Sequence, residues 1–490
     1  MEMTTQAKSL KEKTARGVFW GGISNALQQI MQVVFGIFMA RILFPEDFGL
    51  VGLLTVFSIL AITLQDGGFS IALINRKNVS EEEYSSVFWI NIIISSILYF
   101  SLFFLSPLIA EYFSEPRLVV LSRVVFTTFL FSSVGLVHNT ILTKKIEIKK
   151  LTIVNLISLF VSCAIGLIMA ILDFSYWAIA IQMVVLSILK TVLLWILSSW
   201  RPQFTLNFRF IKSIFSFSLN MLLSSLTTQL SNGMFSVLLG KYTNINQVGY
   251  YTQSSKWALI PYGLVCNVIH TVSLPVLAEV KGNTIREHIV FRKLLRFSAF
   301  ISLPVTLGFG FVVSELIPIF VGEIWNECIP IIQLFCISGA LNPIFLVYNN
   351  ILVSNQYSKY ILIYNVTYSI LLILLLFFTI KYGIPTMVMS MIILQIMTFC
   401  FTLYYTKLKL GLLINNFIKD VFPFLLVTLS VFAIAHLCTY RLDNLWSILV
   451  LKITISVSGY ILLMNLLNVT IFKESFSFIK EKALSVLKNN

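Results

Sequence analysis

The sequence predicts an all-α polytopic membrane protein with about 14 transmembrane helices, arranged as two pseudo-symmetric six-helix lobes plus two C-terminal helices. Three observations support this. Of the 490 residues, 58% are hydrophobic and 11% are charged, whereas about 25% of the residues in an ordinary soluble domain are charged. Most of the hydrophobic segments are close to the roughly 20 residues that cross a hydrocarbon core as a helix. Two blocks of the first half also recur in the second half.

The predicted spans follow one another through short connections. They cover about 17–40, 48–66, 85–108, 118–142, 151–172, 176–198, 213–240, 248–278, 290–313, 328–352, 358–380, 384–405, 420–438 and 445–468. The eighth contains Pro261 and Pro275, so we expect it to kink or to end early. Segment 315–327 is short and has polar flanks, and we expect an interfacial loop or short helix there. The tail from Phe472 to Asn490 is predicted to be a basic amphipathic helix at the membrane surface.

Basic residues predict the orientation. With the N-terminus inside, 26 Lys and Arg residues fall in cytoplasmic segments and 5 in outer loops. Because Lys and Arg are enriched in cytoplasmic loops, both termini are predicted to be cytoplasmic and the number of spans to be even. The same bias accounts for most of the net charge of +14, so nucleic-acid binding is not predicted.

An internal repeat predicts the domain organisation: an N-terminal six-helix lobe over 1–200, a C-terminal six-helix lobe over 201–410, and two additional helices with a basic tail over 411–490. At an offset of 200 residues, Asn25, Gln29, Gln32, Phe35, Arg41 and Gly49 match Ser225, Gln229, Asn232, Phe235, Lys241 and Gly249. At an offset of 210, Asn139, Leu142, Lys149 and Asn155 match Asn349, Leu352, Lys359 and Asn365. Six spans separate each pair, so the lobes point the same way, as in transporters with parallel repeats.

The first span is too polar for a helix that faces lipid on all sides. Asn25, Gln29, Gln32 and Gly36 lie at positions i, i+4, i+7 and i+11, which share one helical face. Polar groups inside a membrane need partners. This face is therefore expected either to line a wet cavity or to hydrogen-bond with other helices. We favour a substrate-binding cavity wall made by Gln29, Gln32, Gln229 and Asn232.

Arg292, Lys293, Arg296 and Lys359 lie near the inner ends of their spans and are counted above with the cytoplasmic segments. Four other basic residues lie within predicted spans, namely Arg123, Lys190, Lys256 and Lys452. A charge at the centre of a membrane helix costs at least about 2.5–3.5 kcal/mol on insertion scales, which makes it a functional candidate. Lys256 and Arg123 are the preferred contacts for an anionic substrate group, and the alternative is snorkelling to the interface. Arg16, at the inner mouth of the first span, is a third candidate, with the positive-inside bias as the competing explanation. We expect Lys190 to snorkel inward.

Other polar residues are assigned less direct roles. Asp66 ends the second span in LQDGGFS and is a candidate ion-coupling carboxylate, the alternative being that it caps the turn at Gly67 and Gly68. Arg41 and Lys241 are expected to be structural at the outer rim. The histidines in the fourth and eighth spans, His138 and His270, are expected to pack through hydrogen bonds. The scattered Cys and His residues predict no metal site, and we predict no cofactor and no catalytic residue.

Several blocks resemble a known family. ALQQIMQVVFGIFMARILFPEDFGLVG and LQDGGFSIALINRKNVSEEEYSSVFWIN resemble the start of Wzx-type flippases. They are most similar to the WzxC-like lipopolysaccharide and exopolysaccharide branch of the multidrug/oligosaccharidyl-lipid/polysaccharide (MOP) exporter superfamily. ILTKKIEIKKLTIVNLIS and SKWALIPYGLVCNVIHTVSLPVLAEVKGN carry the resemblance further, over about residues 1–410.

The resemblance implies a multi-pass protein of the bacterial inner membrane. Such a flippase would move a lipid-diphosphate-linked oligosaccharide from the cytoplasmic to the periplasmic leaflet by alternating access. The implied partners are a polyprenyl-diphosphate-linked oligosaccharide, membrane lipids and a polysaccharide polymerase or export machinery.

Two other functions stay open. An ion-coupled drug or cation antiporter of the same superfamily would need an acidic cavity, whereas the four basic residues within the predicted spans outnumber Asp66. A membrane polysaccharide polymerase or glycosyltransferase could place catalytic carboxylates at Glu46 and Asp47 in the first outer loop. Against this, no large extracytoplasmic loop is predicted that could hold an acceptor.

Overall fold

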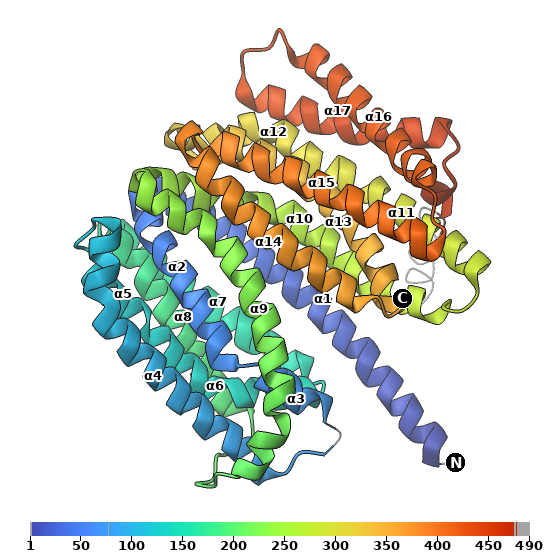
Figure 1. The fold of residues 1–490 in the computed structure, drawn as a ribbon. Helices are drawn as coiled ribbons and strands as arrows, with labels where there is room; N and C mark the ends of the chain where they lie inside the picture. Colours follow the sequence, from blue (N-terminus) through green and yellow to red (C-terminus); the bar gives the residue numbers. More distant parts are fainter. Residues whose placement is uncertain (1, 77, 475–476, 478–490) are drawn as a thin grey trace, which may run out of the picture. The chain divides into compact units, whose positions relative to one another are not determined.

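The computed structural model describes residues 2–76, 78–474 and 477, and the side chains of residues 2–19 and of some residues in α9 (Phe208–Tyr242) and α14 (Ser358–Thr379) lie outside this description. The described residues form helices and connecting segments with no strand among them, which confirms the all-α prediction (Figure 1). The chain divides between Thr252 and Gln253 into two compact units. We call them unit 1 and unit 2.

The helices of unit 1 follow the predicted spans closely. They are α1 (Glu2–Ile42), α2 (Pro45–Asp66), α3 (Phe69–Asn75), α4 (Glu81–Phe113), α5 (Leu118–Val125), α6 (Thr127–Lys144), α7 (Ile148–Ile171), α8 (Tyr176–Leu197) and α9. The fourth predicted span consists of two helices, α5 and α6, that meet at Phe126. The short helix α3 lies in the connection after the second span and was not predicted.

In unit 1, α1 packs against α7, α7 and α6 pack against α8, and α9 packs against α2, α3 and α4. Unit 1 therefore extends past residue 200, where we divide the predicted lobes, because α9 is held by helices of the N-terminal half. The division into lobes at residue 200 stays a prediction.

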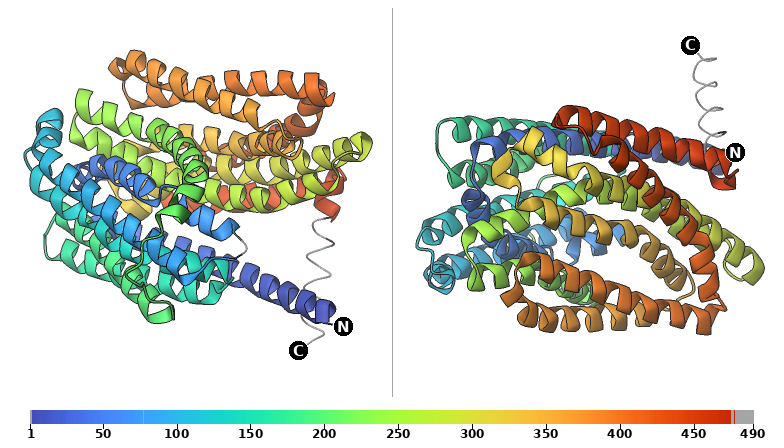
Figure 2. Two further views of the ribbon diagram at one scale, coloured as in Figure 1. Left: turned by 60° about the horizontal axis from the view of Figure 1, so that its bottom comes forward. Right: turned by 90° about the horizontal axis from the view of Figure 1, so that it is seen from above.

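Unit 2 continues the chain from within α10 (Ile245–Glu279). Its further elements are α11 (Thr284–Ser302), the π-helical turn η1 (Leu303–Leu307), α12 (Gly308–Leu316), the π-helical turn η2 (Ile317–Val321), the 3-10 turn η3 (Glu323–Trp325), α13 (Cys328–Ser354), α14, the 3-10 turn η4 (Ile380–Tyr382), α15 (Ile384–Leu410), α16 (Ile414–Thr439) and α17 (Leu445–Leu466). Helix α13 packs against α11 and α15, and α14 and α15 run side by side (Figure 2). The pair α16 and α17 also packs together (Figure 1).

Two expectations for unit 2 are met only in part. Helix α10 passes through both Pro261 and Pro275 and does not end early, and a kink at these prolines stays a prediction. Segment 315–327 was expected to be an interfacial loop or short helix outside the spans. Its first part instead belongs to a candidate membrane span, because α12 continues to Leu316 and η2 continues to Val321. The wider π-helical turns contain Pro304 and Pro318, and such turns accommodate a residue that lacks the N–H needed for the α-helical bond. Only the final part of segment 315–327 forms the short connection that was expected.

Thirteen helical segments in the described part of the chain are long and apolar enough to cross a membrane. Helix α9 occupies the position of the remaining predicted span, although some of its side chains lie outside the description. The count of 14 and the orientation stay predictions. Most of the predicted C-terminal surface helix, residues 475–476 and 478–490, also lies outside the described residues.

The helix boundaries repeat at the two offsets found in the sequence. Helices α1 and α9 end at Ile42 and Tyr242, and the next helices, α2 and α10, begin at Pro45 and Ile245, an offset of 200 residues in each case. The combined α5–α6 segment covers 118–144 and α13 covers 328–354, an offset of 210 at both ends. The repeated blocks therefore correspond to equivalent helix junctions.

The turn after the second block repeats in its backbone conformation as well. Ile146 and Gln356, which are 210 residues apart, both have a positive φ, 57° and 65°. Their amides donate to the carbonyl oxygens of Thr143 and Val353, each at 3.0 Å. A left-handed residue after a helix is a common way to end it. The same end followed by the same restart supports an internal duplication.

Candidate functional site

The polar face of the first span is largely open to the surroundings. Asn25 and Gln32 are exposed and Gln29 is half-buried. A Cβ atom built on Gly36, at the end of the same face, would meet no atom within 4 Å. The face presents amides to whatever fills the adjacent space.

A different face of α1 makes the contact with α7. Phe35 meets Phe160 edge-on with ring centroids 5.9 Å apart, and the Thr152 hydroxyl donates to the Trp20 carbonyl at 3.4 Å. The Gln28 amide donates to the carbonyl and hydroxyl of Ser24 at 3.2 and 2.9 Å. Two neighbouring glutamines of α1 thus have different surroundings. Gln28 is bonded within its own helix, and Gln29 lies on the amide face.

Helix α10 carries a second polar face within unit 2. Lys256, Asn267 and His270 are exposed, and a Cβ atom on Gly263 would meet nothing within 4 Å. The spacing of 7, 11 and 14 residues from Lys256 places all four on one side of the helix. At about 1.5 Å per residue, Lys256 and His270 are roughly 21 Å apart along the axis. This face thus runs through much of a ~30 Å hydrocarbon core.

The two copies of the repeated turn touch each other within unit 1. A Cβ atom on Gly49 would lie 2.2 Å from the carbonyl oxygen of Ile245, and one on Gly249 would lie 1.9 Å from that of Pro45. Each glycine faces the helix start of the other copy, which is the reciprocal pattern of a two-fold contact. Only glycine leaves room for such an approach, so the glycines shared by the two blocks have a packing reason.

The Pro45-Glu46-Asp47 turn joins several connections of unit 1. Glu46 pairs with Arg117 at 2.6 Å, and Arg117 also pairs with Glu115. Asp47 accepts from the Phe44 amide at 2.9 Å and from the Ser175 hydroxyl. Hydrogen bonds to the two glutamates, acting against burial, raise the pKa of Arg117. Both carboxylates proposed for catalysis are therefore engaged in holding loops together.

The predicted cations have different surroundings. Arg123 is half-buried, donates from Nε to the Ser106 hydroxyl at 3.0 Å and lies 4.2 Å from the centre of the Phe103 ring. These contacts attach α5 to α4. Lys190 on α8 is half-buried as well. Lys256, by contrast, is exposed on the polar face of α10.

The rim residues and the acidic candidate have mainly local contacts. Lys241 donates to the Tyr112 carbonyl at 2.8 Å and lies 4.6 Å from the centre of that ring. Arg41 is exposed in the last turn of α1. Asp66 accepts from the Ser70 amide at 3.3 Å at the start of α3, which is the capping geometry that was the alternative to ion coupling.

The remaining predicted positions are only partly described. The side chains of Arg16 and Asn232 lie outside the described residues, while Gln229 is half-buried on α9. His138 is fully buried between Trp195 and Trp200, with ring centroids 4.8 and 5.1 Å away. Neither of its ring nitrogens has a hydrogen-bond partner among the described residues. Aromatic contacts thus replace the hydrogen bonds expected for His138.

Sequence reasoning missed an acid inside unit 2. Glu315 of α12 and Lys452 of α17 form a salt bridge at 2.7 Å, and both side chains are at least nine-tenths buried. Glu315 was expected in an interfacial loop, so the count of intramembrane charges omitted it. A buried carboxylate needs a paired charge, and its partner lies 137 residues away in the sequence. A lysine inside the last apolar span was the signal that an acid should be sought.

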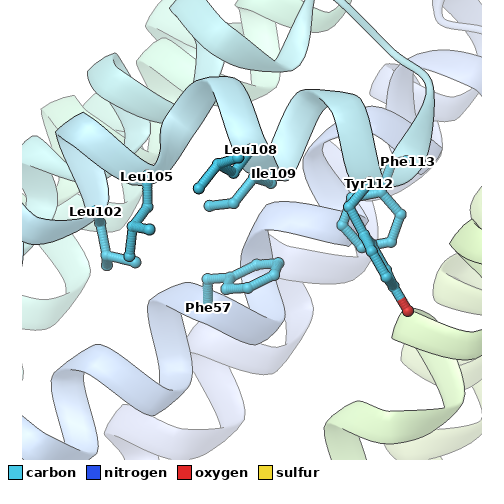
Figure 3. A pocket seen from close by; sticks show the side chains of 7 residues that line it. All are labelled: Phe57, Leu102, Leu105, Leu108, Ile109, Tyr112 and Phe113. Carbon is cyan, nitrogen blue, oxygen red and sulfur yellow. The ribbon is translucent and has the colours of Figure 1, made fainter.

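An apolar pocket of about 320 Å³ lies between α2 and α4. Figure 3 shows Phe57 of α2 facing Leu105 and Ile109 of α4, with Tyr112 and Phe113 at one end. Such a lining suits hydrocarbon and offers little to a sugar or phosphate. No group of three or more His, Cys, Asp or Glu residues that could hold a metal ion occurs in the part of the chain that the structure describes.

Comparisons with known proteins place these features in a family. Residues 38–330 match the family described as polysaccharide biosynthesis protein. The lipopolysaccharide biosynthesis protein WzxC of Escherichia coli (strain K12) is 25% identical over 342 residues, which cover 69% of this chain and 69% of that protein.

Two solved structures resemble the fold. A lipid II flippase, MurJ, in an inward closed conformation has a TM-score of 0.73 at 16% identity and covers 94% of this chain and 98% of its own. An inward-facing multidrug resistance MATE family transporter of the MOP superfamily has a TM-score of 0.64 at 15% identity, with 78% and 94% covered. At these identities the likeness shows the fold, which is the one predicted from the sequence.

Proposed function

The chain belongs to the polysaccharide biosynthesis protein family, and from that premise we propose that it carries a lipid-diphosphate-linked oligosaccharide from the cytoplasmic to the periplasmic leaflet. The Wzx-type resemblance is confirmed, and the chain is a multi-pass protein of the bacterial inner membrane. Relatives and fold both support a transporter of the flippase type. The substrate and the mechanism are the proposal.

The observation that carries the proposal is the pair of exposed polar faces on apolar membrane helices. Helix α1 presents Asn25, Gln29 and Gln32, and α10 presents Lys256 and Asn267. Lipid tails cannot satisfy an amide or an ammonium group. A sugar headgroup with a diphosphate needs amides for its hydroxyls and a cation for its phosphates. The α1 face carries amides, and the α10 face carries an ammonium group and an amide.

We assign the phosphate contact to Lys256 and the sugar contacts to the amides of Gln29 and Gln32. Arg123 is the second candidate for a phosphate contact, and its guanidinium also contacts Ser106 and Phe103. The lipid chain can stay in the bilayer during transport, so only the headgroup needs a polar path. Gln229, Asn232 and Arg16 remain part of the proposed cavity as sequence-based assignments.

The reciprocal glycine contact supports an alternating-access mechanism. Gly49 and Gly249 bring two equivalent helix starts together without side chains between them. A contact of backbone on backbone can serve as a pivot, because no interdigitated side chains have to be separated when one helix rolls on the other. We propose that rocking of the two lobes uses this point.

An antiporter of drugs or organic cations is the second candidate, and the MATE-like fold favours it. The charges favour the flippase instead. Glu315 neutralises Lys452, which leaves three of the four basic residues assigned above to the interior of the spans, Arg123, Lys190 and Lys256, against Asp66. A basic balance suits an anionic substrate. For the polymerase alternative, Glu46 and Asp47 are already occupied by Arg117 and Ser175.

The direct test is leaflet transfer in vesicles. Purified protein is reconstituted with a fluorescent polyprenyl-diphosphate oligosaccharide, and a membrane-impermeant quencher reports which leaflet holds the label. We expect transfer that depends on the protein. A labelled lipid that stays in its original leaflet, with and without proton or sodium gradients, would reject the proposal. Gradient-driven export of organic cations in the same vesicles would favour the antiporter.

Matched variants test the assigned contacts. Lys256→Gln should slow transfer about tenfold, the loss expected for one charge-assisted hydrogen bond, whereas Lys241→Gln removes an equal charge from the rim and should preserve it. Gln29→Leu with Gln32→Leu should impair transfer, and Gln28→Leu should not, because the Gln28 amide bonds within its own helix. Equal rates for Lys256→Gln and Lys241→Gln would remove Lys256 from the site.

A further inference from the structure

A cluster of buried charge lies where α11 meets α16 in unit 2. Arg292 donates from Nε and a terminal nitrogen to both oxygens of Asp420, at 2.7 and 2.9 Å. Arg296 donates from Nε to one of the same oxygens at 2.6 Å. The Asp420 side chain is fully buried. One carboxylate thus fixes two guanidinium groups side by side.

This cluster has a surplus of positive charge. Two arginines and one aspartate leave one charge uncompensated, and the arginine side chains are 32% and 39% exposed. Within the described residues, the bonds to Asp420 use the Nε donors of both and one terminal nitrogen of Arg292. The other N–H donors of the two guanidinium groups are not used in these bonds. Planar donors held in place in this way are well suited to phosphate oxygens.

A cavity of about 640 Å³ opens beside the cluster. Arg292, Arg296, Lys293 and His288 contribute its polar wall, and Ile285 and Ile289 contribute an apolar part. The two isoleucines are 77% and 64% exposed. A water-soluble anion has no apolar part that could bury the exposed isoleucines next to the cations. Cations beside an apolar lip fit an amphiphile with a phosphate group.

One carboxylate that lines this cavity would repel an anion bound there. Glu474 lines it and pairs with Lys293 at 2.6 Å. Both side chains are more than half exposed, and such pairs contribute little because water screens them. A phosphate can therefore displace Glu474 from Lys293 without a large cost.

We propose that this cavity binds the phosphate of a membrane lipid. Its residues come from the start of α11, in a segment that the charge bias predicts to be cytoplasmic, where basic pockets between membrane helices bind anionic headgroups. Two lipids share this chemistry: an anionic phospholipid of the inner leaflet, and the lipid diphosphate of the proposed substrate. Binding is measured directly, so the inference holds or fails independently of transport.

The experiment compares lipid binding in variants that leave the buried aspartate paired. Full-length protein in phosphatidylcholine nanodiscs is titrated with phosphatidylglycerol, with undecaprenyl diphosphate and with inorganic phosphate, and retained lipid is counted by native mass spectrometry. The test variant is Lys293→Gln with Arg296→Gln, in which Arg292 still holds Asp420. The control is Lys145→Gln with Lys212→Gln, which removes two exposed charges from other predicted cytoplasmic segments.

We expect the test variant to bind lipid about tenfold more weakly, as the loss of two cations near a membrane surface implies, and the control to bind as the unaltered protein does. Glu474→Gln should bind more tightly, a gain that misfolding would not produce. Retention of phosphatidylglycerol identifies a phospholipid site, and retention of undecaprenyl diphosphate alone identifies a substrate site. Equal binding in the test and control variants, or retention of neither lipid, would overturn the proposal.

Discussion

Replacing Gly249 by alanine probes the reciprocal contact between α2 and α10. The new Cβ atom would lie 1.9 Å from the Pro45 carbonyl oxygen and 2.7 Å from its carbon. Carbon–oxygen contacts in proteins are about 3.3 Å or longer. The two helix starts would therefore have to separate by more than ~1 Å, because backbone atoms, unlike a flexible side chain, cannot turn away.

The expected cost follows from two opposing effects. Overpacking of a well-packed site costs about 1–3 kcal/mol, and this site belongs at the upper end because both partners are backbone. Alanine gains about 1 kcal/mol over glycine in a helix interior. The net destabilisation is then about 1–2 kcal/mol for Gly249→Ala, and Gly49→Ala should behave alike, with its Cβ atom 2.2 Å from the Ile245 oxygen.

The control lies on the same helix. A Cβ atom on Gly263 would meet nothing within 4 Å, so Gly263→Ala should stabilise the protein by up to about 1 kcal/mol. Thermal unfolding midpoints in one detergent, followed by size-exclusion chromatography of heated samples, measure the difference. A Gly249→Ala midpoint equal to or above that of Gly263→Ala would refute the close contact.

Three further predictions concern carboxylates. Lys452→Met should lower stability by about 3–5 kcal/mol because it leaves Glu315 buried and unpaired, and adding Glu315→Met should restore most of the loss; a double variant no more stable than the single one would contradict the pair. Asp47→Ala should cost about 1–2 kcal/mol in the same thermal assay, since it removes the helix cap and the bond from Ser175, and an unchanged midpoint would argue against this role. Asp66→Asn should keep the cap and shift stability by less than ~0.5 kcal/mol. If Asp66 couples transport to an ion, leaflet transfer by this variant should lose its dependence on a proton gradient. Unchanged dependence would leave Asp66 with the capping role alone.

Part of the candidate site could be proposed from the sequence because its signal is local. The amide face of α1 follows from the spacing of Asn25, Gln29 and Gln32, and the cavity wall assigned to it stays a prediction. The α10 face was only partly recognised. Lys256 and His270 were weighed separately, although their spacing already places them on one side of a helix.

Other assignments depended on neighbours that a linear pattern does not reveal. Arg123 was predicted as a phosphate contact from its position alone, and only the structure shows that its guanidinium bonds to Ser106 and so attaches α5 to α4. Asp66 could be read as an ion site or as a cap, and only the position of the Ser70 amide, 3.3 Å away, gives it a partner. Such distinctions require the coordinates of the atoms around each charge.

The sequence by itself determined the class of protein, the positions of most spans, the internal repeat and the family, because hydropathy, helical periodicity and recurring blocks are written along the chain. Only the tertiary structure decided which charges meet. Lys452 pairs with Glu315, which is 137 residues away in the sequence, and Arg292 pairs with Asp420, which is 128 residues away. It also showed that Gly49 and Gly249 each lie against the other copy of the turn. Contacts of this kind arise when distant helices pack, and no local rule of spacing or composition encodes them.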